Sequence, residues 1–286
     1  MNNETLFPPD RVSVMGVLNT TPDSFSDGGR LYSSEEGLLL RELQAGAQRL
    51  VEAGAHLLDI GGESTRPGAL EVQVGDEIRR TEGAIRSVAA STSVPISIDT
   101  RKAEVAQVAI KAGASVINDV SGLSHDPSLA VVAAQTGSVL ILGHMQGTPQ
   151  TMQTRPHYSD LLQEVARDLQ KSIDIARAAG VDSEQLVIDP GIGFGKRLED
   201  NLLLIAHAGW FREHFGLPVL IGPSRKAFIG TLTGDPVTER DLPSHAACAV
   251  AAFTGADAVR VHEASGALRS VLIGKAIRDA SAKVAT

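Results

Sequence analysis

Eight short apolar runs, each ending at a cluster of polar residues, constrain this chain of 286 residues more than any other feature. The runs cover residues 12–18, 56–60, 95–98, 115–117, 139–142, 186–188, 219–221 and 258–261. They lack polar/apolar alternation, which is typical of strands buried on both faces of a parallel sheet. Because polar residues gather at the same end of every run, the sequence predicts a pocket for a polar ligand there.

The segments between these runs carry helical signals. Residues 33–36 resemble a capping box, and apolar residues follow at spacings of three and four, so we predict a helix over residues 34–53. Four glycines stand just before the next apolar run, where a left-handed residue ends a helix without steric strain. They are Gly54, Gly113, Gly180 and Gly255.

Repeated strand and helix units predict the fold class. Eight such units in one α/β chain match the (β/α)₈ TIM barrel, whose sites lie at the carboxyl ends of the strands. An open, doubly wound sheet is the alternative, but it would gather its ligand groups at one switch point rather than at every strand end. We therefore predict a single barrel domain over residues 1–286.

Composition narrows the possible partners. The formal net charge of −8 argues against a nucleic-acid or anionic membrane surface, which requires clustered Lys and Arg. The longest apolar stretch, residues 246–253, is too short to span a bilayer, and the polar, acidic start resembles no signal or transit peptide. A cytoplasmic protein with no membrane partner is expected. The single cysteine, Cys248, lies in that apolar stretch and is expected to pack in the core.

A long polar loop follows the first run. Asn19 stands directly at the strand end, where its amide oxygen suits a hard cation and its amide nitrogen suits a phosphate. The composition of residues 19–29 also fits a simple turn, although long loops in barrels are usually functional. Phe25 is the one aromatic residue in this polar loop, so we expect it to cover a ligand.

Several later clusters offer groups that bind anions. Residues 61–68 combine glycine N–H groups, hydroxyls and the guanidinium of Arg66, and the alternative for them is a flexible surface loop. Residues 222–226 and 260–262 add further donors at the seventh and eighth strands, where barrels often bind phosphate. Arg260 lies inside an apolar run, so its charged group must reach the open end and find a partner.

Asp99, Asn118 and Asp189 end the third, fourth and sixth runs. Buried carboxylates need donors, and a flat heterocycle with adjacent N–H groups would supply them. The alternative is that each side chain only caps the following helix, and for Asp119 this is the favoured interpretation. Convergence of the other three on one barrel mouth favours ligand binding.

The polar clusters resemble the motifs of the dihydropteroate synthases. The two signature loops are MGVLNTTPDSFSDGG at residues 15–29 and DIGGESTRPG at residues 59–68. Further matches follow in order at residues 98–100, 117–122, 144–149, 189–196, 224–226 and 260–262. Short motifs such as residues 98–100 are shared with pterin-binding methyltransferases, whereas the first loop together with Ser-Arg-Lys at 224–226 is specific. Ala227 departs from the serine common in the family.

This resemblance implies a reaction in folate biosynthesis. 6-Hydroxymethyl-7,8-dihydropterin diphosphate and 4-aminobenzoate would give 7,8-dihydropteroate and diphosphate, with Mg²⁺ as cofactor. The family usually forms homodimers and is the target of sulfonamides, so both properties are expected. The implied catalytic residues are Asp99, Lys226, Arg260 and His262.

The resemblance also assigns the substrate-binding residues. Asp189 and Asn118 would bind the N–H edge of the pterin, and Asp99 would stabilise positive charge as diphosphate leaves. Diphosphate would be held by Thr65, Arg66, Arg260, His262 and Mg²⁺ on Asn19. Lys226 would donate to the pterin carbonyl and ring nitrogen, Met145 and Phe194 would pack around the ring, and Phe25, Pro67 and Ser224 would frame the aminobenzoate. Gly222 is a further expected substrate-binding residue.

Two other functions compete with this assignment. A corrin-linked methyltransferase would share Asp99, Asn118 and Asp189 but has no diphosphate to hold. Thr65, Arg66 and Lys226 argue against it. A non-catalytic homologue would keep the fold and lose activity, and the intact loops argue against that. One assay separates all three: release of diphosphate from the two substrates.

Overall fold

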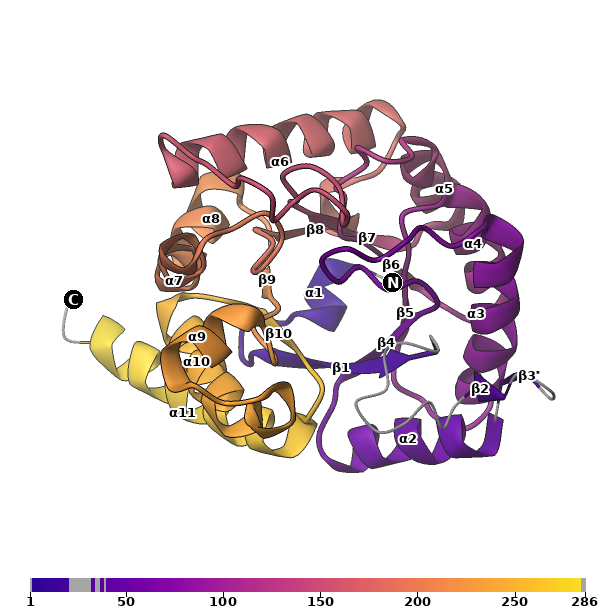
Figure 1. The fold of residues 1–286 in the computed structure, drawn as a ribbon, viewed down its shortest axis with the longest axis horizontal. Coiled ribbons are helices and arrows are strands. Elements are labelled where there is room, and N and C mark those ends of the chain that lie inside the picture. The colour runs from indigo at the N-terminus through magenta and orange to yellow at the C-terminus, as the bar shows by residue number, and fades with distance from the viewer. Residues whose placement is uncertain (1, 21–31, 34–36, 39, 284–286) are drawn as a thin grey trace.

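The computed structural model describes residues 2–20, 32–33, 37–38 and 40–283 and shows parallel strands surrounded by a ring of helices (Figure 1). The eight strands of the sheet are β1 (Ser13–Asn19), β4 (Leu57–Gly61), β5 (Ile96–Asp99), β6 (Val116–Asp119), β7 (Val139–Gly143), β8 (Leu186–Asp189), β9 (Leu220–Ile221) and β10 (Ala258–Val261). Their order is β8-β7-β6-β5-β4-β1-β10-β9, and a parallel bridge between Ile188 and Val219 joins the two ends. The predicted barrel is confirmed, and the open sheet is wrong.

The helices alternate with the strands along the chain. They are α1 (Asn3–Leu6), α2 (Leu40–Glu52), α3 (Val74–Ala89), α4 (Ala103–Ala112), α5 (Ser128–Thr136), α6 (Leu161–Ala178), α7 (Leu198–Ala206), α8 (Ala208–Phe215), α9 (Ala227–Thr233), α10 (Asp241–Thr254) and α11 (Ala264–Ala282), with short 3-10 turns at Ser183–Gln185 and Val237–Glu239. None of the helices in the described ranges is both long enough and apolar enough to cross a membrane. That the entire chain forms one domain stays a prediction.

The boundary of α2 differs from the prediction. The helix begins at Leu40 rather than at residue 34, because Gly37–Leu38 (β3) pairs antiparallel with Tyr32–Ser33 (β2). Glycine is a poor residue for a helix interior, and a local strand pair satisfies its backbone instead. Residues 34–36 of the expected capping box lie outside the described residues. The four glycines expected to end helices all have positive φ, from 93° at Gly180 to 124° at Gly113.

Side chains inside the barrel form a closed apolar core at its amino end. The residues are Leu6, Phe7, Met15, Leu57, Val116, Val139, Ile141, Val187, Leu220 and Ala258. Helix α1 covers this end, since the side-chain amide of Asn3 donates to Leu186 O over 2.8 Å and the hydroxyl of Ser13 donates to Leu6 O over 2.7 Å. The barrel is therefore a packed body with one open end.

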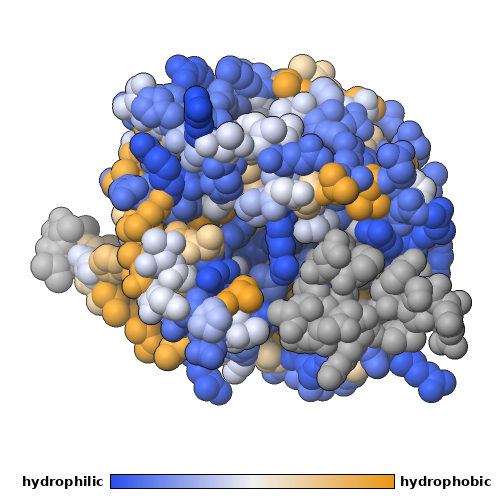
Figure 2. Space-filling view, in the orientation of Figure 1, coloured by the Kyte–Doolittle hydropathy of each residue, from blue (hydrophilic) through white to orange (hydrophobic). Residues whose placement is uncertain are grey.

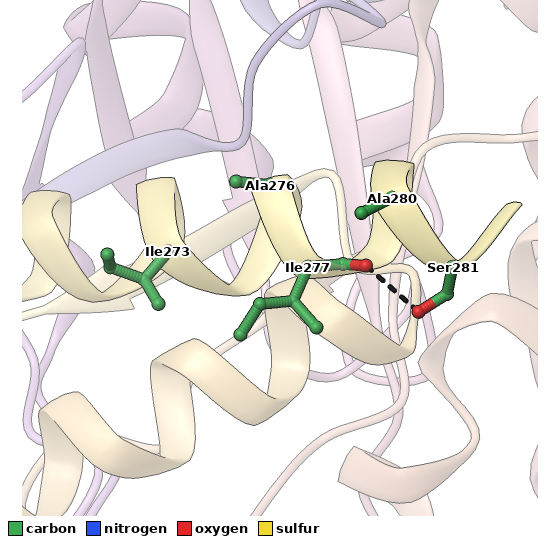
Figure 3. Close-up of a pocket in the computed structure, with 5 residues that line it drawn as sticks. All are labelled: Ile273, Ala276, Ile277, Ala280 and Ser281. Atoms are coloured by element: carbon green, nitrogen blue, oxygen red, sulfur yellow. Dashed lines mark hydrogen bonds between the residues drawn. The ribbon is translucent and has the colours of Figure 1, made fainter. Parts of the chain in front are cut away.

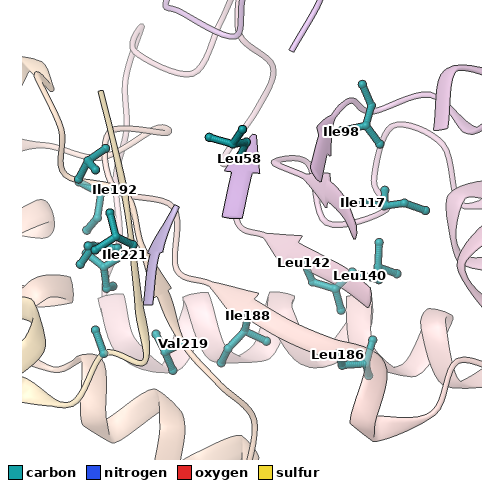
Figure 4. Close-up of a cluster of buried hydrophobic side chains, with 14 of the residues drawn as sticks. Leu58, Ile98, Ile117, Leu140, Leu142, Leu186, Ile188, Ile192, Val219 and Ile221 are labelled. Carbon is teal, nitrogen blue, oxygen red and sulfur yellow. The ribbon is translucent and has the colours of Figure 1, made fainter. Parts of the chain in front are cut away.

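A second core lies between the strands and the helices. Successive residues of a strand point to opposite faces, so Leu58, Ile98 and Ile117 pack outward in this layer (Figure 4). Cys248 belongs to the same layer and is fully buried, as expected, and burial raises the pKa of its thiol to about 12. The same alternation turns Asp59 and Arg260 toward the barrel interior, because each lies two residues after an inward-facing residue, Leu57 and Ala258 respectively.

The turn after β8 generates a prediction about stability. Gly191 has φ +77°, and a Cβ there would lie 1.8 Å from the carbonyl oxygen of His144. Gly191→Ala should lower the free energy of unfolding by more than the roughly 1 to 3 kcal/mol of backbone strain, because the chain must also move. The control is Gly137→Ala, where φ is +66° but no atom lies within 4 Å. Equal midpoints in urea for the two variants would contradict this close packing.

Candidate active site

The guanidinium of Arg260 is the centre of the open end of the barrel. Its Nε donates to Oδ2 of Asp59 over 2.6 Å, and its Nη2 donates to Oδ2 of Asp99 over 2.7 Å. The charge of Arg260 inside the last strand was expected to need a partner. That partner is a pair of carboxylates, from β4 and β5. Asp99 was expected at this site, whereas Asp59 was not singled out from the sequence.

Two carboxylates share this one guanidinium. Burial raises the pKa of Asp99 to about 7, with Arg260 opposing the rise and the charges of Asp59 and Glu77 adding to it. Burial alone would lower the pKa of Arg260, but Asp59 and Asp99 outweigh burial and raise it. The cluster of Asp59, Asp99 and Arg260 thus carries excess negative charge at neutral pH once Asp99 is ionised.

Asn118 joins the same cluster from β6. Its side-chain nitrogen donates to Oδ2 of Asp59 over 3.1 Å, and the side chain is buried. This bond assigns the amide nitrogen to Asp59 and leaves the amide oxygen as the acceptor for a ligand. Asp99 and Asn118 are therefore brought together as predicted, and neither serves as a simple helix cap.

Asp189 and Lys226 face the cluster from the ends of β8 and β9. Oδ1 of Asp189 accepts the N–H of Gly191 over 2.7 Å. Burial raises the pKa of Asp189, although that N–H and the charges of Lys226 and Arg260 oppose the rise. Burial and, to a lesser degree, the charge of Arg260 together lower the pKa of Lys226 to about 8. At the mouth Asp189 is therefore buried and Lys226 half-buried, where a ligand can pair with both charged groups.

An apolar wall lies beside these charges. Phe194 packs with Met145, Val120 and Met152, and Nζ of Lys226 lies 4.1 Å from the centre of the Phe194 ring. Phe194 and Met145 were expected around a ring-shaped ligand, and the structure places them together. The segment that carries Phe194 is clamped by the buried Lys196, whose Nζ donates to Phe194 O over 3.0 Å and contacts Nδ1 of His144 at 2.9 Å.

Ser224 and His262 form a second pair at the mouth. Oγ of Ser224 lies 3.0 Å from Nδ1 of His262 and accepts the backbone N–H of His262 over 3.2 Å. Burial and the charges of Arg225, Arg260 and Lys226 lower the pKa of His262 to about 3, so its ring is neutral at pH 7. Gly222 is half-buried, with the position of a Cβ 3.7 Å from Cβ of Arg260.

Not every residue of the Ser-Arg-Lys motif faces the mouth. Arg225 has φ 57° and pairs with both oxygens of Asp241 on α10, at 2.7 and 2.9 Å. Its backbone N–H donates to the hydroxyl of Ser244 over 2.9 Å. The guanidinium therefore anchors this turn to α10. The departure at Ala227 lies at the start of α9, where the residue is exposed.

The loop after β4 is anchored by a buried charge network that includes Glu63. Lys102 bridges Oε2 of Glu63 at 2.5 Å and Oε2 of Glu77 at 2.6 Å. Arg101 also binds Glu63, and the hydroxyl of Thr100 donates to Glu77 over 2.6 Å. The start of this loop is therefore fixed, and the alternative of a flexible surface loop does not describe it. Neither glutamate was expected from the sequence.

The end of this loop crosses the barrel mouth. Thr65 is half-buried, Arg66 and Pro67 are exposed, and Arg66 is close enough for its charge to lower the pKa of Lys226. The N–H of Gly68 donates to Pro149 O over 2.9 Å, which ties the loop to the segment after β7. The predicted anion-binding residues thus share one mouth with Lys226.

Two expected residues belong to the first loop. Asn19 ends β1 in register with Gly61 of β4, and it is half-buried at the mouth. Phe25 lies outside the described residues. In the part of the chain that the structure describes, no three His, Cys, Asp or Glu side chains are grouped so that they could hold a metal ion.

Asp119 was expected to cap local backbone rather than to bind a ligand, and its contacts are local. Its carboxylate accepts the N–H and hydroxyl of Ser121, at 2.8 and 2.6 Å, and the N–H of Leu123 at 2.6 Å. These are local backbone-capping bonds, although they close a turn rather than a helix. Asp119 is therefore structural.

Comparison with known proteins agrees with this geometry. A family model described as pterin binding enzyme matches residues 15–262. The dihydropteroate synthase of Synechocystis sp. is 45% identical over 262 residues, which cover 91% of this chain and 88% of that protein. That of Escherichia coli K12 is 43% identical over 263 residues, with 92% and 90% covered. The Yersinia pestis dihydropteroate synthase, solved with a sulfonamide drug complex, has a TM-score of 0.88 at 42% identity, covering 94% of this chain and 95% of its own.

Site and matches together place the chain in the class of pterin-binding barrel enzymes. It belongs to the dihydropteroate synthase family, whose members are transferases. The resemblance seen in the sequence motifs is confirmed over nearly the whole chain.

The buried network generates a prediction about stability. Lys102→Met should lower the free energy of unfolding by about 3 to 5 kcal/mol at pH 7, because it leaves buried carboxylates without their shared cation. Burial already raises the pKa of Glu77, so protonation of Glu77 removes the unpaired charge and the loss should shrink as pH falls.

The matched control is Lys171→Met, which breaks an exposed pair with Asp168. Exposed pairs contribute little, so this variant should unfold near the wild-type temperature. Thermal unfolding at several pH values compares the two. A Lys102 variant that unfolds with the control would show that the network does not anchor the loop.

Proposed function

We propose that the groups around Arg260 carry the dihydropteroate synthase reaction. The amine of 4-aminobenzoate forms a bond to the exocyclic methylene of the dihydropterin diphosphate. The bond from that carbon to the diphosphate oxygen breaks, diphosphate leaves with the electron pair, and the amine loses a proton. The observation that carries the proposal is the joining of Asp59, Asp99, Asn118 and Arg260 at the open end, opposite Asp189 and Lys226.

The pterin is held by its polar edge. Asp189 accepts the adjacent ring donors, because its carboxylate is buried and has only the Gly191 N–H as a donor among the described residues. Asn118 presents its amide oxygen, since its nitrogen is held by Asp59. Lys226 donates to the pterin carbonyl and a ring nitrogen, and Phe194 with Met145 covers the ring face. The same Lys226 also faces the aromatic ring of Phe194.

Charge stabilisation assists the departure of diphosphate. The methylene becomes cation-like as its bond to oxygen breaks, and the carboxylate of Asp99 lies where it can stabilise that charge. No covalent enzyme intermediate is required, so catalysis consists of positioning and preorganised electrostatics. The negative excess around Arg260 supports this role.

Diphosphate is bound by donors from two parts of the mouth. Thr65 and Arg66 come from the loop after β4, and Arg260 and His262 come from β10 and the residue that follows it. The Ser224 hydroxyl accepts the backbone N–H of His262 and lies 3.0 Å from Nδ1, and we assign the tautomer in which Ser224 donates to Nδ1, so that Nε2–H of the neutral ring is a donor for the diphosphate. Ser224 and Pro67 frame the aminobenzoate, and the contact expected from Phe25 lies outside the described residues.

The donor set fits a magnesium ion that arrives with the diphosphate. Mg²⁺ prefers oxygen ligands and commonly uses few protein groups together with substrate phosphates. Asn19 supplies one amide oxygen at the mouth, and no cage of three acidic or imidazole groups occurs among the described residues. Asn19 would hold the ion, which when bound neutralises charge on the leaving group.

The relatives also bear on substrates and alternatives. Xanthomonas albilineans dihydropteroate synthase has been solved with 4-aminobenzoic acid and with 7,8-dihydropteroate, which supports the same ligands here. A corrin-linked methyltransferase binds no diphosphate, so Arg66 and Lys226 at one mouth argue against that function. The same two residues argue against a non-catalytic homologue, which requires no catalytic groups. We expect the enzyme to act in the cytoplasm.

Release of diphosphate tests the proposal. Purified protein is mixed with the dihydropterin diphosphate, 4-aminobenzoate and Mg²⁺, and diphosphate and dihydropteroate are measured together. Equal amounts of both products support the reaction. Absence of both products with a correctly folded protein would contradict it, and binding of the pterin alone would indicate a non-catalytic homologue.

The first functional prediction concerns Asp189. Asp189→Asn places an amide donor against a ring donor, so pterin binding should weaken by roughly 2 to 5 kcal/mol, the range for truncating one partner of a buried charge pair. Calorimetric titration of the pterin alcohol measures the change. The Asp119→Asn variant is the control, because Asp119 is also buried and its carboxylate binds only its own turn. Wild-type affinity in Asp189→Asn would remove this carboxylate from the pocket.

The second functional prediction concerns pH. Asp99 must be ionised, so kcat/KM should fall as pH drops below about 7. Lys226 must be protonated, so kcat/KM should fall again as pH rises above about 8. Lys226→Arg keeps the positive charge at high pH and should remove the alkaline limb, even if its rate is lower. An unchanged alkaline limb in that variant would assign the limb to another group.

The third prediction concerns assembly as a homodimer. Ile273 and Ile277, exposed by 62% and 53%, project from one side of α11 and line a shallow hollow with Ala276, Ala280 and Ser281 (Figure 3). Hydrophobic side chains also gather along the edge formed by α10 and α11 (Figure 2). A second copy is the occupant we propose, because such a surface meets its own equivalent across a twofold axis.

Sedimentation distinguishes the two states. Ile277→Asp should turn a dimer into a monomer, because it buries a charge in an apolar interface. Val131→Asp is the control, since Val131 is 43% exposed on α5, far from α11 around the barrel. A monomeric wild type, or a dimer that survives Ile277→Asp, would contradict this surface.

A further inference from the structure

Asp59 holds the amide nitrogen of Asn118 in the proposed reaction, but neither the sequence motifs nor that reaction assigns a catalytic consequence to its buried charge. It lies within β4, is completely buried, and does not end its strand as Asp99 and Asp189 do. Burial of a carboxylate is costly unless it is paired, so its presence requires a reason.

The two oxygens of Asp59 have different surroundings. Oδ2 accepts both Nε of Arg260, at 2.6 Å, and Nδ2 of Asn118, at 3.1 Å. Oδ1 is buried and accepts no hydrogen bond from any described residue. One oxygen thus fixes two functional side chains, and the charge of the group is compensated only in part.

The hydrogen bond between Asp59 and Nε of Arg260 fixes the orientation of the guanidinium. With Nε held by Asp59 and Nη2 held by Asp99, the plane of the guanidinium is determined and its Nη1 donors remain for a ligand. The bond from Asn118 likewise determines which end of its amide faces the pocket. Without Asp59, the amide of Asn118 could turn and present a donor where the ligand has one.

The charge of Asp59 also acts on Asp99. The groups that act on Asp99 most strongly are Arg260 from β10, Asp59 from β4, Glu77 from α3 and Lys226 after β9. Asp59 raises the pKa of Asp99 more than Glu77 does, and both Asp59 and Asp99 bind the same guanidinium. Part of the negative field at the reacting methylene therefore originates from β4.

We propose that Asp59 is a positioning residue of the reaction, which holds Arg260 and the amide of Asn118 in place and adds negative charge beside Asp99. This inference rests on the proposed function, because its consequence is read from the same reaction. It assigns a role to a residue inside the strand rather than to one of the loop residues that touch substrate.

Asp59→Asn is the test. Asparagine has the same shape but loses the charge, so it holds Arg260 and the amide of Asn118 more weakly and removes the negative field beside Asp99. Three results are expected. First, kcat falls by up to roughly 100-fold, as misplaced groups can cause. Second, the acid limb of kcat/KM moves to lower pH, because a repelling carboxylate beside Asp99 is gone, and third, affinity for the pterin alcohol falls.

The acid limb separates positioning from stability. Asp119→Asn removes an equally buried carboxylate and should lower the unfolding temperature while leaving the acid limb in place. An Asp59→Asn enzyme whose acid limb and pterin affinity match the wild type would overturn the inference. Because wild-type turnover is measured in the same series, failure of the wild type would instead reject the proposed function.

If Asp59→Asn does not fold, Asp59→Glu keeps the charge, and an acid limb at the wild-type pH is then expected. A limb that shifts despite the retained charge would also overturn the inference.

Discussion

The site depends on one guanidinium held between two carboxylates. Arg260 reaches Asp59 and Asp99 from β10, and β1 lies between β10 and β4 in the sheet. These side chains meet because the barrel brings strands that are distant in sequence to the same interior. Each charge would be costly alone in the interior, and together they form a cluster that one cation cannot fully neutralise. That residual negative charge is what the proposed chemistry uses.

A second charge network lies behind the first and shares its segment of chain. Asp99 faces Arg260, whereas Thr100 and Lys102 hold Glu77, and Lys102 also holds Glu63. Residues 99–102, which include Arg101 bound to Glu63, therefore contribute to the reactive cluster and also anchor the loop that carries Thr65 and Arg66. Binding and structure are coupled here, so the position of the anion-binding loop depends on a network that touches no substrate.

Much of this arrangement could be predicted from the sequence, for a physical reason. Parallel strands bring their carboxyl ends to one rim, so Asp99, Asn118 and Asp189 could be placed together without coordinates. Asp59 could not, because it lies inside an apolar run rather than at its end. One signal did exist: Arg260 and Asp59 are opposite charges embedded in two apolar runs, and each requires a partner. Glu63 and Glu77 gave no comparable signal, since their cations follow β5 and meet them only in the folded barrel. The start of α2 was placed too early because a two-strand pairing at Gly37 outweighs helical spacing.

A crystal structure with the dihydropterin bound would show whether the cluster around Arg260 binds substrate. We expect the N–H edge of the ring on Asp189 and on the amide oxygen of Asn118, with Arg260 still bonded to both Asp59 and Asp99. A ring bound outside the barrel mouth, or an Arg260 that leaves Asp59 when the pterin binds, would contradict this expectation.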